Sequence, residues 1–474
     1  MAEMSATSEA GSFDDLSLSP GLRAALKQLD YATMTPIQAA SLPITLGGHD
    51  LIAQAKTGSG KTAAFAIPLL THLNPRRFAV QAMVLCPTRE LAEQVTQEIR
   101  RLARFEDNIK VLSLCGGTPI GPQRASLEHG AHIVVGTPGR LMDHLERGSL
   151  RLDALNTLVF DEADRMLDMG FYDDIVFVAE HCPAHRQTLL FSATYPDGIE
   201  TLAGRFMRHP QEIKLPERHE DNKIRQRFYE IKHEERLPAV ATLLKHYRPV
   251  STLAFCNTKQ QCRDLLDLLH AQGFHALTLN GDLEQRERDQ VLIQFANRSC
   301  SVLVATDVAA RGLDIDRLEA VINVDVTPDP EIHIHRIGRT GRADEDGWAF
   351  SLCSPRDRRR VESIARMTGS QPEWHTLGSL QGGHDNALIP PMVTLQILGG
   401  RKEKIRPGDV LGALTAETPG MRTLTREQVG KIAVTDQSTY VAVAREIAGE
   451  AVRKLSTGKL KGKTVKVRVL ENAR

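Results

Sequence analysis

At 474 residues the chain is too long for one hydrophobic core, which predicts two or three domains. Hydrophobic residues make up 41% and charged residues 25%, as is ordinary for globular proteins, so composition leaves both enzyme and scaffold possible. Residues 1–12 lack the basic and apolar regions of a signal peptide, and the longest apolar run, 63–70, is too short for a membrane span. We therefore expect neither secretion nor membrane insertion.

The seven cysteines are odd in number and form no Cys-x-x-Cys pair. This pattern predicts neither a disulfide framework nor a zinc site. A reducing, cytoplasmic location fits it best.

The formal net charge of zero hides an asymmetry along the chain. The segment 391–474 holds 16 of the 59 Lys and Arg residues but only 8 of the 59 Asp and Glu residues, so the rest of the chain is acidic. A basic terminal segment on an acidic body favours a polyanion as its partner. An ordinary solvated surface is the alternative interpretation of charge alone.

Strand-like aliphatic runs alternate with helix-like segments, which predicts α/β domains with parallel sheets. A first series precedes the charge-rich stretch 217–223, and a second series follows it. The candidate strands are 83–86, 133–135, 158–160 and 188–191, then 252–255, 277–280, 302–305 and 320–324.

These patterns divide the chain into segments. Residues 367–391 mix Gly, Ser, Gln, His and Pro without periodicity and are interpreted as a linker. The expected order is a disordered N-terminus over 1–12, a first domain over 13–216, an interdomain linker over 217–223, a second domain over 224–366, the linker over 367–391 and a third domain over 392–474.

A phosphate-binding loop is predicted at residues 55–62, with the sequence Ala-Lys-Thr-Gly-Ser-Gly-Lys-Thr. It stands between a strand over 50–53 and a helix over 63–70, which is the context that a P-loop requires. Lys61 can reach the β and γ oxygens of a nucleotide, and the Thr62 hydroxyl can hold Mg²⁺. Ala55 departs from the usual glycine, and a chance glycine-rich turn is the alternative interpretation.

The acidic tetrad Asp161-Glu162-Ala163-Asp164 directly follows the strand 158–160. A carboxylate at the carboxyl end of a parallel strand faces the ligand crevice. We expect Asp161 to hold Mg²⁺ and Glu162 to orient or deprotonate the water that attacks the γ-phosphate. Taken alone, such a tetrad could also be a helix cap or a solvated turn.

Further short motifs occur in a fixed order around these two. They are Thr35-Pro36-Ile37-Gln38, 87–92 (Pro-Thr-Arg-Glu-Leu-Ala), Gly116-Gly117, Thr137-Pro138-Gly139-Arg140, Ser192-Ala193-Thr194, 310–314 (Ala-Arg-Gly-Leu-Asp) and 335–342 (His-Arg-Ile-Gly-Arg-Thr-Gly-Arg). Over residues 13–366 this series resembles the DEAD-box helicase family. The resemblance implies two tandem RecA-like P-loop domains of the α/β class, with ATP between them and RNA across both.

The resemblance also implies roles at the nucleotide. Gln38 would recognise adenine, whose edge needs the donor and acceptor of a glutamine amide. Asp30 and Met34 depart from the Gly and Pro frequent in this motif. Arg339 and Arg342 would be arginine fingers, and the catalytic set would be Lys61, Asp161, Glu162, Arg339 and Arg342. The nucleotide set is Phe13, Tyr31, Gln38, Ala55, Lys56, Thr57, Gly58, Ser59, Gly60, Lys61, Thr62, Gly312 and Asp314; Ser192, Thr194, Asp307 and His335 would couple hydrolysis to movement.

For RNA, the resemblance implies contacts from small, polar or cationic residues in both domains. Such groups suit phosphate and sugar, carry little sequence information, and favour RNA through its 2′-hydroxyl groups. Target choice must then come from elsewhere. The implied contact residues are Arg89, Gly117, Thr137, Arg140, Arg288 and Thr306.

The third domain reads as β-α-β-β-α-β, a small RRM-like α+β sandwich. Its expected strands are 393–397, one near 432, 440–443 and 464–470, and its helices are 409–414 and 444–455. Tyr440 is the only aromatic residue after Trp374, so base stacking cannot be the main mode of RNA binding. The expected RNA contacts are instead cationic: Arg401, Lys402, Lys404, Arg406, Lys431, Lys459, Lys461 and Lys463.

The glycine- and lysine-rich runs of this third domain resemble the C-terminal domain of DbpA-type bacterial helicases. The resemblance implies a hairpin of 23S ribosomal RNA, or pre-50S particles, as the partner. A dimerisation domain or a generic RNA tether is the alternative.

The sequence thus predicts an ATP- and Mg²⁺-dependent RNA helicase that unwinds short duplexes, with no DNA or membrane partner. An ATP-gated RNA clamp or a general RNA chaperone is the alternative. A DNA helicase is disfavoured by the tetrad and the RNA-type third domain.

Overall fold

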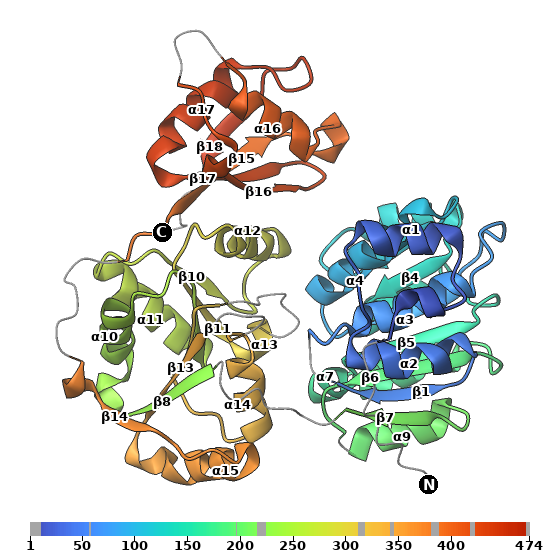
Figure 1. Ribbon diagram of the computed structural model, residues 1–474, viewed down its shortest axis with the longest axis horizontal. Helices are drawn as coiled ribbons and strands as arrows, with labels where there is room; N and C mark the ends of the chain where they lie inside the picture. Colours follow the sequence, from blue (N-terminus) through green and yellow to red (C-terminus); the bar gives the residue numbers. More distant parts are fainter. Residues whose placement is uncertain are drawn as a thin grey trace. The chain divides into compact units, whose positions relative to one another are not determined.

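The computed structural model describes residues 11–55, 58–195, 197–215, 224–310, 318–341, 346–380, 388–417 and 422–470. The chain forms two compact units, one of residues 1–218 with 312–314 and one of 219–311 with 315–474 (Figure 1). Residues 1–10 and 216–223, where we expect a disordered segment and a linker, lie outside the described residues. Ser12, also expected to be disordered, instead caps a short 3-10 helix, because its hydroxyl accepts the Asp14 N–H at 3.2 Å.

The first unit is built on a seven-stranded parallel sheet in the order β3-β4-β2-β5-β6-β1-β7. Its central strands are buried on both faces, as aliphatic runs in parallel sheets are. The strands are β1 (Leu51–Gln54), β2 (Ala82–Leu85), β3 (Val111–Leu114), β4 (Ile133–Gly136), β5 (Thr157–Asp161), β6 (Gln187–Ser192) and β7 (Gln211–Lys214).

Helices cover both faces of this sheet, and successive residues of a strand enter opposite cores. Val159 belongs to one apolar cluster and its neighbours Leu158 and Phe160 to the other. The helices are α1 (Pro20–Gln28), α2 (Pro36–Leu46), α3 (Lys61–Thr71), α4 (Arg89–Leu102), α5 (Ile120–Glu128), α6 (Pro138–Glu146), α7 (Ala163–Asp168), α8 (Tyr172–Glu180) and α9 (Asp197–Phe206).

The second unit repeats this topology in its first part. Its parallel sheet has the order β10-β11-β9-β12-β13-β8-β14, which matches the first sheet strand for strand. Two RecA-like domains with parallel sheets are therefore confirmed. The elements are β8 (Ile224–Glu230), α10 (Arg236–Tyr247), β9 (Thr252–Cys256), α11 (Lys259–Ala271), β10 (Ala276–Leu279), α12 (Gln285–Ala296), β11 (Val302–Thr306), α13 (Asp307–Ala310), β12 (Ala320–Asn323), α14 (Pro330–Ile337), β13 (Gly347–Cys353), α15 (Arg358–Thr368) and β14 (Trp374–Thr376).

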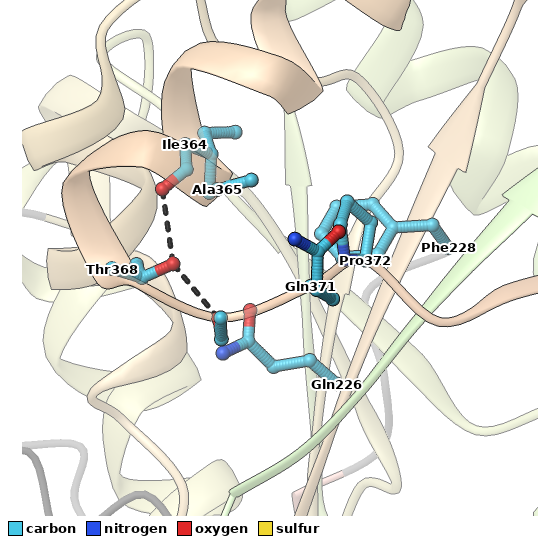
Figure 2. Close-up of a pocket in the computed structure, with 8 residues that line it drawn as sticks. Gln226, Phe228, Ile364, Ala365, Thr368, Gln371 and Pro372 are labelled. Carbon is cyan, nitrogen blue, oxygen red and sulfur yellow. Dashed lines mark hydrogen bonds between the residues drawn. The ribbon is translucent and has the colours of Figure 1, made fainter.

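The boundary predicted at residue 366 is too early. Helix α15 runs to Thr368, and β14 pairs with β8 as an edge strand of the second sheet. Residues 370–372 close a small pocket against Gln226 and Phe228 of β8, with Ile364 and Thr368 of α15 on its other side (Figure 2). A three-residue edge strand leaves no periodic pattern, which is why the sequence indicates only a linker there.

The C-terminal domain has the predicted β-α-β-β-α-β order and an antiparallel sheet, β16-β17-β15-β18. Both helices pack on one face of this sheet over a core that includes Leu395 and Val441. The second helix begins at residue 448 rather than 444, because β17 extends to Ala444. The elements are β15 (Met392–Leu398), α16 (Pro407–Thr415), β16 (Val429–Val434), β17 (Thr439–Ala444), α17 (Ala448–Thr457) and β18 (Lys466–Val469).

The other face of this sheet packs on the end of α12 within the second unit (Figure 1). The Thr394 hydroxyl lies 2.6 Å from that of Ser299 and accepts the Asn297 amide at 3.1 Å, and Tyr440 accepts the Gln290 amide at 3.4 Å. Tyr440 is only 4% exposed, so it presents no free ring face to a base. No helix among the described residues has both the length and the apolarity to cross a membrane.

Candidate nucleotide and RNA sites

The motifs of the first domain follow adjacent strands of its sheet. The phosphate loop follows β1, Asp161 is the last residue of β5, and Ser192 is the last residue of β6. These three strands are neighbours in the order β5-β6-β1. The segments 86–90, 115–118 and 137–140 follow β2, β3 and β4, which are neighbours in the order β3-β4-β2. Ligands bind at the carboxyl ends of parallel strands. We name the two halves of this edge after the ligands that the sequence predicts for their motifs, the nucleotide half and the RNA half.

The phosphate loop has the backbone that its glycines allow. Gly58 and Gly60 have φ angles of +81° and +94°, a region costly for other residues. Lys61, the first residue of α3, is buried and donates from Nζ to the Ala55 carbonyl at 3.0 Å, a bond that a phosphate oxygen could replace. Ser59 and Thr62 flank this glycine–lysine pair in the chain, whereas Lys56 and Thr57 lie outside the described residues.

Gln38 joins the predicted adenine motif to the phosphate loop. Its amide N–H donates to the Gly60 carbonyl at 3.1 Å, and its amide oxygen accepts the Thr35 N–H at 2.9 Å. A glutamine amide has a second N–H and a second lone pair, so these bonds leave one donor and one acceptor. Phe13 and Tyr31 form an edge-to-face pair 5.8 Å apart, and the Tyr31 hydroxyl donates to Glu98.

Asp161 is a buried carboxyl group at the end of β5. Burial raises its pKa to about 7, because the low dielectric disfavours the charged form more than the nearby Lys61 ammonium favours it. Repulsion from the neighbouring Glu162 carboxylate contributes to this rise in the pKa of Asp161. A carboxyl group that titrates near neutral pH at a ligand edge is typical of a functional site.

Glu162 occupies an unusual backbone position. Its φ of +54° places a non-glycine residue in the left-handed region, a strain typical of functional sites. Its carboxylate accepts the Arg165 guanidinium at 2.7 Å, and both side chains are more than 90% buried. The ion pair orients the Glu162 carboxylate without consuming all of its acceptor sites.

Asp164 connects the acidic tetrad to the Ser-Ala-Thr motif. One of its oxygens accepts the Ala193 N–H at 3.1 Å and both the N–H and the hydroxyl of Thr194 at 2.9 Å. Its own N–H donates to the Ser192 hydroxyl at 3.3 Å. Burial opposes ionisation of Asp164, but these hydrogen bonds and Lys61 outweigh it and lower its pKa. Asp164 therefore contacts both predicted coupling residues, Thr194 through its carboxylate and Ser192 through its backbone N–H.

The RNA half is also a connected network. Arg140 of α6 donates to the Thr118 carbonyl at 3.1 Å and to the Gln123 amide oxygen at 2.9 Å, and the same oxygen lies 2.9 Å from His144. Gln123 in turn donates to Thr118 and to Cys115. The structure thus identifies Gln123 and His144, which no sequence motif marks, as residues that orient Arg140.

The remaining predicted contacts of this half lie in the same place. A Cβ atom on Gly116 would stand 3.2 Å from the Arg89 guanidinium, so the glycine pair allows Arg89 to approach the loop backbone. Gly117 has a φ of +77°, and Thr137 precedes α6 as its N-cap. The structure therefore brings Arg89, Gly117, Thr137 and Arg140 to one place, and their contact with RNA stays a prediction.

In the second unit, Arg336 of α14 forms a bidentate ion pair with Asp307. Its Nε and Nη2 atoms donate to the two Asp307 oxygens at 2.7 and 2.6 Å, and Nη1 donates to the Asp325 carbonyl at 2.7 Å. The Arg336 side chain is 2% exposed and lies over the Phe255 ring. The sequence indicates Asp307 for coupling but not its partner.

Arg288 and Thr306, which are predicted to contact RNA, each lie next to α13. Arg288 of α12 donates to the Ala309 carbonyl of α13 at 3.3 Å, and Thr306 is the last residue of β11, directly before α13. His335 and Arg339 lie at the C-terminal end of α14, where Arg339 is 6% exposed. Gly312, Asp314 and Arg342 lie outside the described residues.

Seven of the eight cationic residues predicted to contact RNA in the C-terminal domain lie in two loops at one end of its sheet. β15 and β18 are antiparallel, and Leu398 pairs with Lys466, so the loop after β15 and the loop before β18 are adjacent. Lys431 does not belong to these loops, because it stands within β16 at a register irregularity. We call the loop residues the basic end: Arg401, Lys402, Lys404, Arg406, Lys459, Lys461 and Lys463.

Three segments of the chain match known families. Residues 35–202 match the DEAD/DEAH box helicase family, 235–344 the helicase conserved C-terminal domain and 394–469 the DbpA RNA binding domain. The chain is 52% identical over 454 residues to the ATP-dependent RNA helicase DbpA of Escherichia coli strain K12. The aligned region covers 96% of this chain and 98% of that protein. The chain belongs to the DEAD-box ATP-dependent RNA helicases and is of the DbpA type.

Other relatives share the helicase domains. The chain is 42% identical to the DEAD-box ATP-dependent RNA helicase CshA of Geobacillus kaustophilus strain HTA426, over 76% of this chain and 77% of that protein. It resembles the structure of Saccharomyces cerevisiae Dbp5 bound to RNA and ADP BeF3 with a TM-score of 0.72 and 30% identity, over 78% of this chain and 96% of that one. This DEAD-box enzyme therefore has the fold of a helicase that was solved with RNA and a nucleotide analogue.

Proposed function

We propose that this RNA helicase uses ATP with Mg²⁺ and acts on 23S ribosomal RNA in cytoplasmic precursors of the large ribosomal subunit. The observation that supports the target is the C-terminal domain, which matches the DbpA RNA binding domain and gathers cations at its basic end. Such a surface suits a structured polyanion, because it offers phosphate contacts without aromatic platforms for single bases.

The nucleotide half supplies groups with separate tasks. Lys61 exchanges its bond to Ala55 for the phosphate oxygens, while Glu162, oriented by Arg165, positions and deprotonates the attacking water. Arg339 belongs to the second unit and stays a predicted arginine finger. Asp164 transmits the state of this half to Thr194 through its carboxylate and to Ser192 through its backbone N–H.

The residues present fit a magnesium ion. Asp161 is a buried carboxyl group beside a phosphate loop, and Thr62 is the hydroxyl residue that follows Lys61. In the parts of the chain that the structure describes, no cluster of three or more His, Cys, Asp or Glu side chains could hold a metal ion. Mg²⁺ that binds through nucleotide phosphates and water needs only one or two protein ligands, here Asp161 and Thr62, and would neutralise phosphate charge.

The pKa of Asp161 predicts how ATP hydrolysis depends on pH. Only the ionised carboxylate attracts a cation, so kcat/KM for ATP should fall about tenfold per pH unit as the pH drops below about 7. Raising the Mg²⁺ concentration should move this midpoint to lower pH, because the cation competes with the proton. A profile that stays flat between pH 8 and pH 6 would contradict the assignment of Asp161.

The raised pKa of Asp161 also affects the free energy of unfolding of the metal-free protein, in the opposite direction to its effect on ATP hydrolysis. Burial raises the folded-state pKa above the ordinary value of 3.8, so the folded protein binds more protons than the unfolded chain between about pH 4 and pH 7. The Asp161 contribution to the free energy of unfolding therefore declines as the pH rises through this window.

The target is tested by ATP hydrolysis of the full chain with no nucleic acid, single-stranded RNA, DNA, or a 23S ribosomal RNA hairpin fragment. We expect the hairpin fragment to stimulate most strongly. The triple variant K402Q/K459Q/K463Q should lose this extra stimulation, since it removes three cations of the basic end.

The matched control removes three arginines of the segment 355–368 elsewhere in the second unit, as R356Q/R359Q/R366Q. These residues are exposed and lie on or beside α15, near the β8–β14 edge, whereas the C-terminal domain packs on α12. Equal stimulation by every RNA, unchanged in the first triple variant, would instead support a general RNA chaperone or clamp with a non-specific tether.

A further inference from the structure

The basic end consists of two loops that are shaped separately. In the first, the Arg401 N–H donates to the Thr435 carbonyl at 2.9 Å, and Lys404 has a φ of +61°. In the second, Leu460 and Lys463 exchange backbone hydrogen bonds at 2.9 and 3.0 Å around Lys461, whose φ is +51°. Each loop thus carries a lysine in a left-handed backbone conformation, but neither shape sets the distance between the loops.

Asp409 contacts both loops. One of its carboxylate oxygens accepts the Arg406 N–H at 2.8 Å, and its own N–H donates to the Arg406 carbonyl at 3.0 Å, which ties the first loop to the start of α16. The other oxygen lies 3.0 Å from the Lys461 ammonium of the second loop. The Asp409 side chain is 23% exposed and that of Lys461 is 46% exposed.

Asp436 provides a contrast in the same part of the domain. It precedes β17, and its carboxylate lies 3.6 Å from the Arg401 guanidinium, with a side chain that is 69% exposed. Its backbone carbonyl accepts the Lys402 N–H at 3.1 Å, so both its carboxylate and its backbone contact the first loop. The two carboxylates therefore place the same charge near the basic end in two different structural roles.

We propose that Asp409 is a positioning residue that holds the two loops of the basic end in one surface for structured RNA. The seven cations of the basic end repel one another. A structured RNA holds its phosphates at fixed spacing, so it binds most tightly when the cations are held at matching positions before binding. An exposed ion pair stabilises a domain little by itself, so the value of this contact lies in loop geometry. The inference rests on the proposed function, namely that the basic end binds RNA.

This proposal and simple electrostatics predict opposite signs. Removing a carboxylate near bound RNA removes a repulsion, so by charge alone both D409N and D436N should tighten RNA binding. If Asp409 positions the loops, D409N should instead weaken it, although the asparagine oxygen still accepts the Arg406 N–H. D409E should bind nearly as tightly as the unaltered chain, because glutamate suits this helix position and keeps the charge.

The experiment measures the affinity of the full chain for a 23S ribosomal RNA hairpin fragment at fixed salt, with a single-stranded RNA of equal length as a second probe. We expect D409N to weaken hairpin binding about three- to tenfold and single-strand binding less, with D436N equal to or tighter than the unaltered chain. Thermal unfolding of each variant shows whether the C-terminal domain stays folded. If D409N unfolds it, K461M replaces D409N as the variant that breaks the loop contact, with K463M as the control for loss of one cation.

The outcomes separate the two proposals. Equal tightening by D409N and D436N, equal weakening by D409N and D409E, or equal weakening by K461M and K463M would overturn the positioning role. Hairpin affinity that is unchanged in K402Q/K459Q/K463Q would overturn the proposed function of the basic end instead.

Discussion

Replacing Glu162 with glutamine should lower the rate of ATP hydrolysis by about 10²- to 10⁴-fold while ATP binding persists. The substitution keeps the size of a side chain that is 4% exposed, but an amide cannot accept the proton of the attacking water. Glu162 has a left-handed backbone conformation, and its carboxylate forms a buried ion pair with Arg165. Both features are costly, and together they fix the orientation of this carboxylate. Single-turnover hydrolysis and nucleotide titration measure the two quantities separately.

The matched control is E180Q. Glu180 ends α8 and pairs with Arg205 at the surface, where both side chains are about half exposed. Its replacement should leave ATP hydrolysis and RNA stimulation unchanged. A loss of less than tenfold in E162Q, or an equal loss in E180Q, would remove Glu162 from the role of general base.

Replacing Arg336 with alanine should lower the free energy of unfolding of the second unit by about 3 to 5 kcal/mol. The change removes a buried cation and leaves the Asp307 carboxylate, together with the Asp325 carbonyl, without its main donors. Replacing Arg336 with lysine should not restore the lost free energy of unfolding, because an ammonium group cannot form the bidentate contact of a planar guanidinium. Chemical unfolding followed by a probe in the second unit measures the effect.

Arg358 supplies the comparison. It pairs with Glu230 at 3.1 Å, but its side chain is 61% exposed, so R358A should cost less than about 1 kcal/mol. Equal shifts of the unfolding midpoint in R336A and R358A would show that the buried Arg336 network stabilises the second unit no more than an exposed ion pair does. A stability loss in R336A with full retention of RNA-stimulated ATP hydrolysis would separate the structural role of Asp307 from its predicted coupling role.

The sequence by itself determined the parts of the enzyme that are local. The phosphate loop and the acidic tetrad each occupy one strand, one turn and one helix, so a few adjacent residues carry both their structure and their chemistry. The alternation of aliphatic runs with helices predicted two parallel sheets for the same reason. The order of β and α elements in the C-terminal domain was also readable, because each has its own short pattern.

Some errors came from segments whose pattern is too weak or too short. Strand β14 has three residues, and β7 is a polar edge strand, Gln-Glu-Ile-Lys, so neither gives an aliphatic signal. Lys431 lies within β16, outside the two loops, and its contact with RNA stays a prediction.

Only the tertiary structure decided which distant residues act together. The order β3-β4-β2-β5-β6-β1 brings the motifs predicted to bind nucleotide to one half of the sheet edge and those predicted to bind RNA to the other. Along the chain, the predicted RNA motifs lie between the first nucleotide motif and the other two. The Gln123–Arg140 contact, the Arg336–Asp307 pair and the Asp409 bridge depend on strand order and loop closure. The physical reason is that a sequence pattern reports which face of an element is buried, whereas these contacts depend on which element lies next to it.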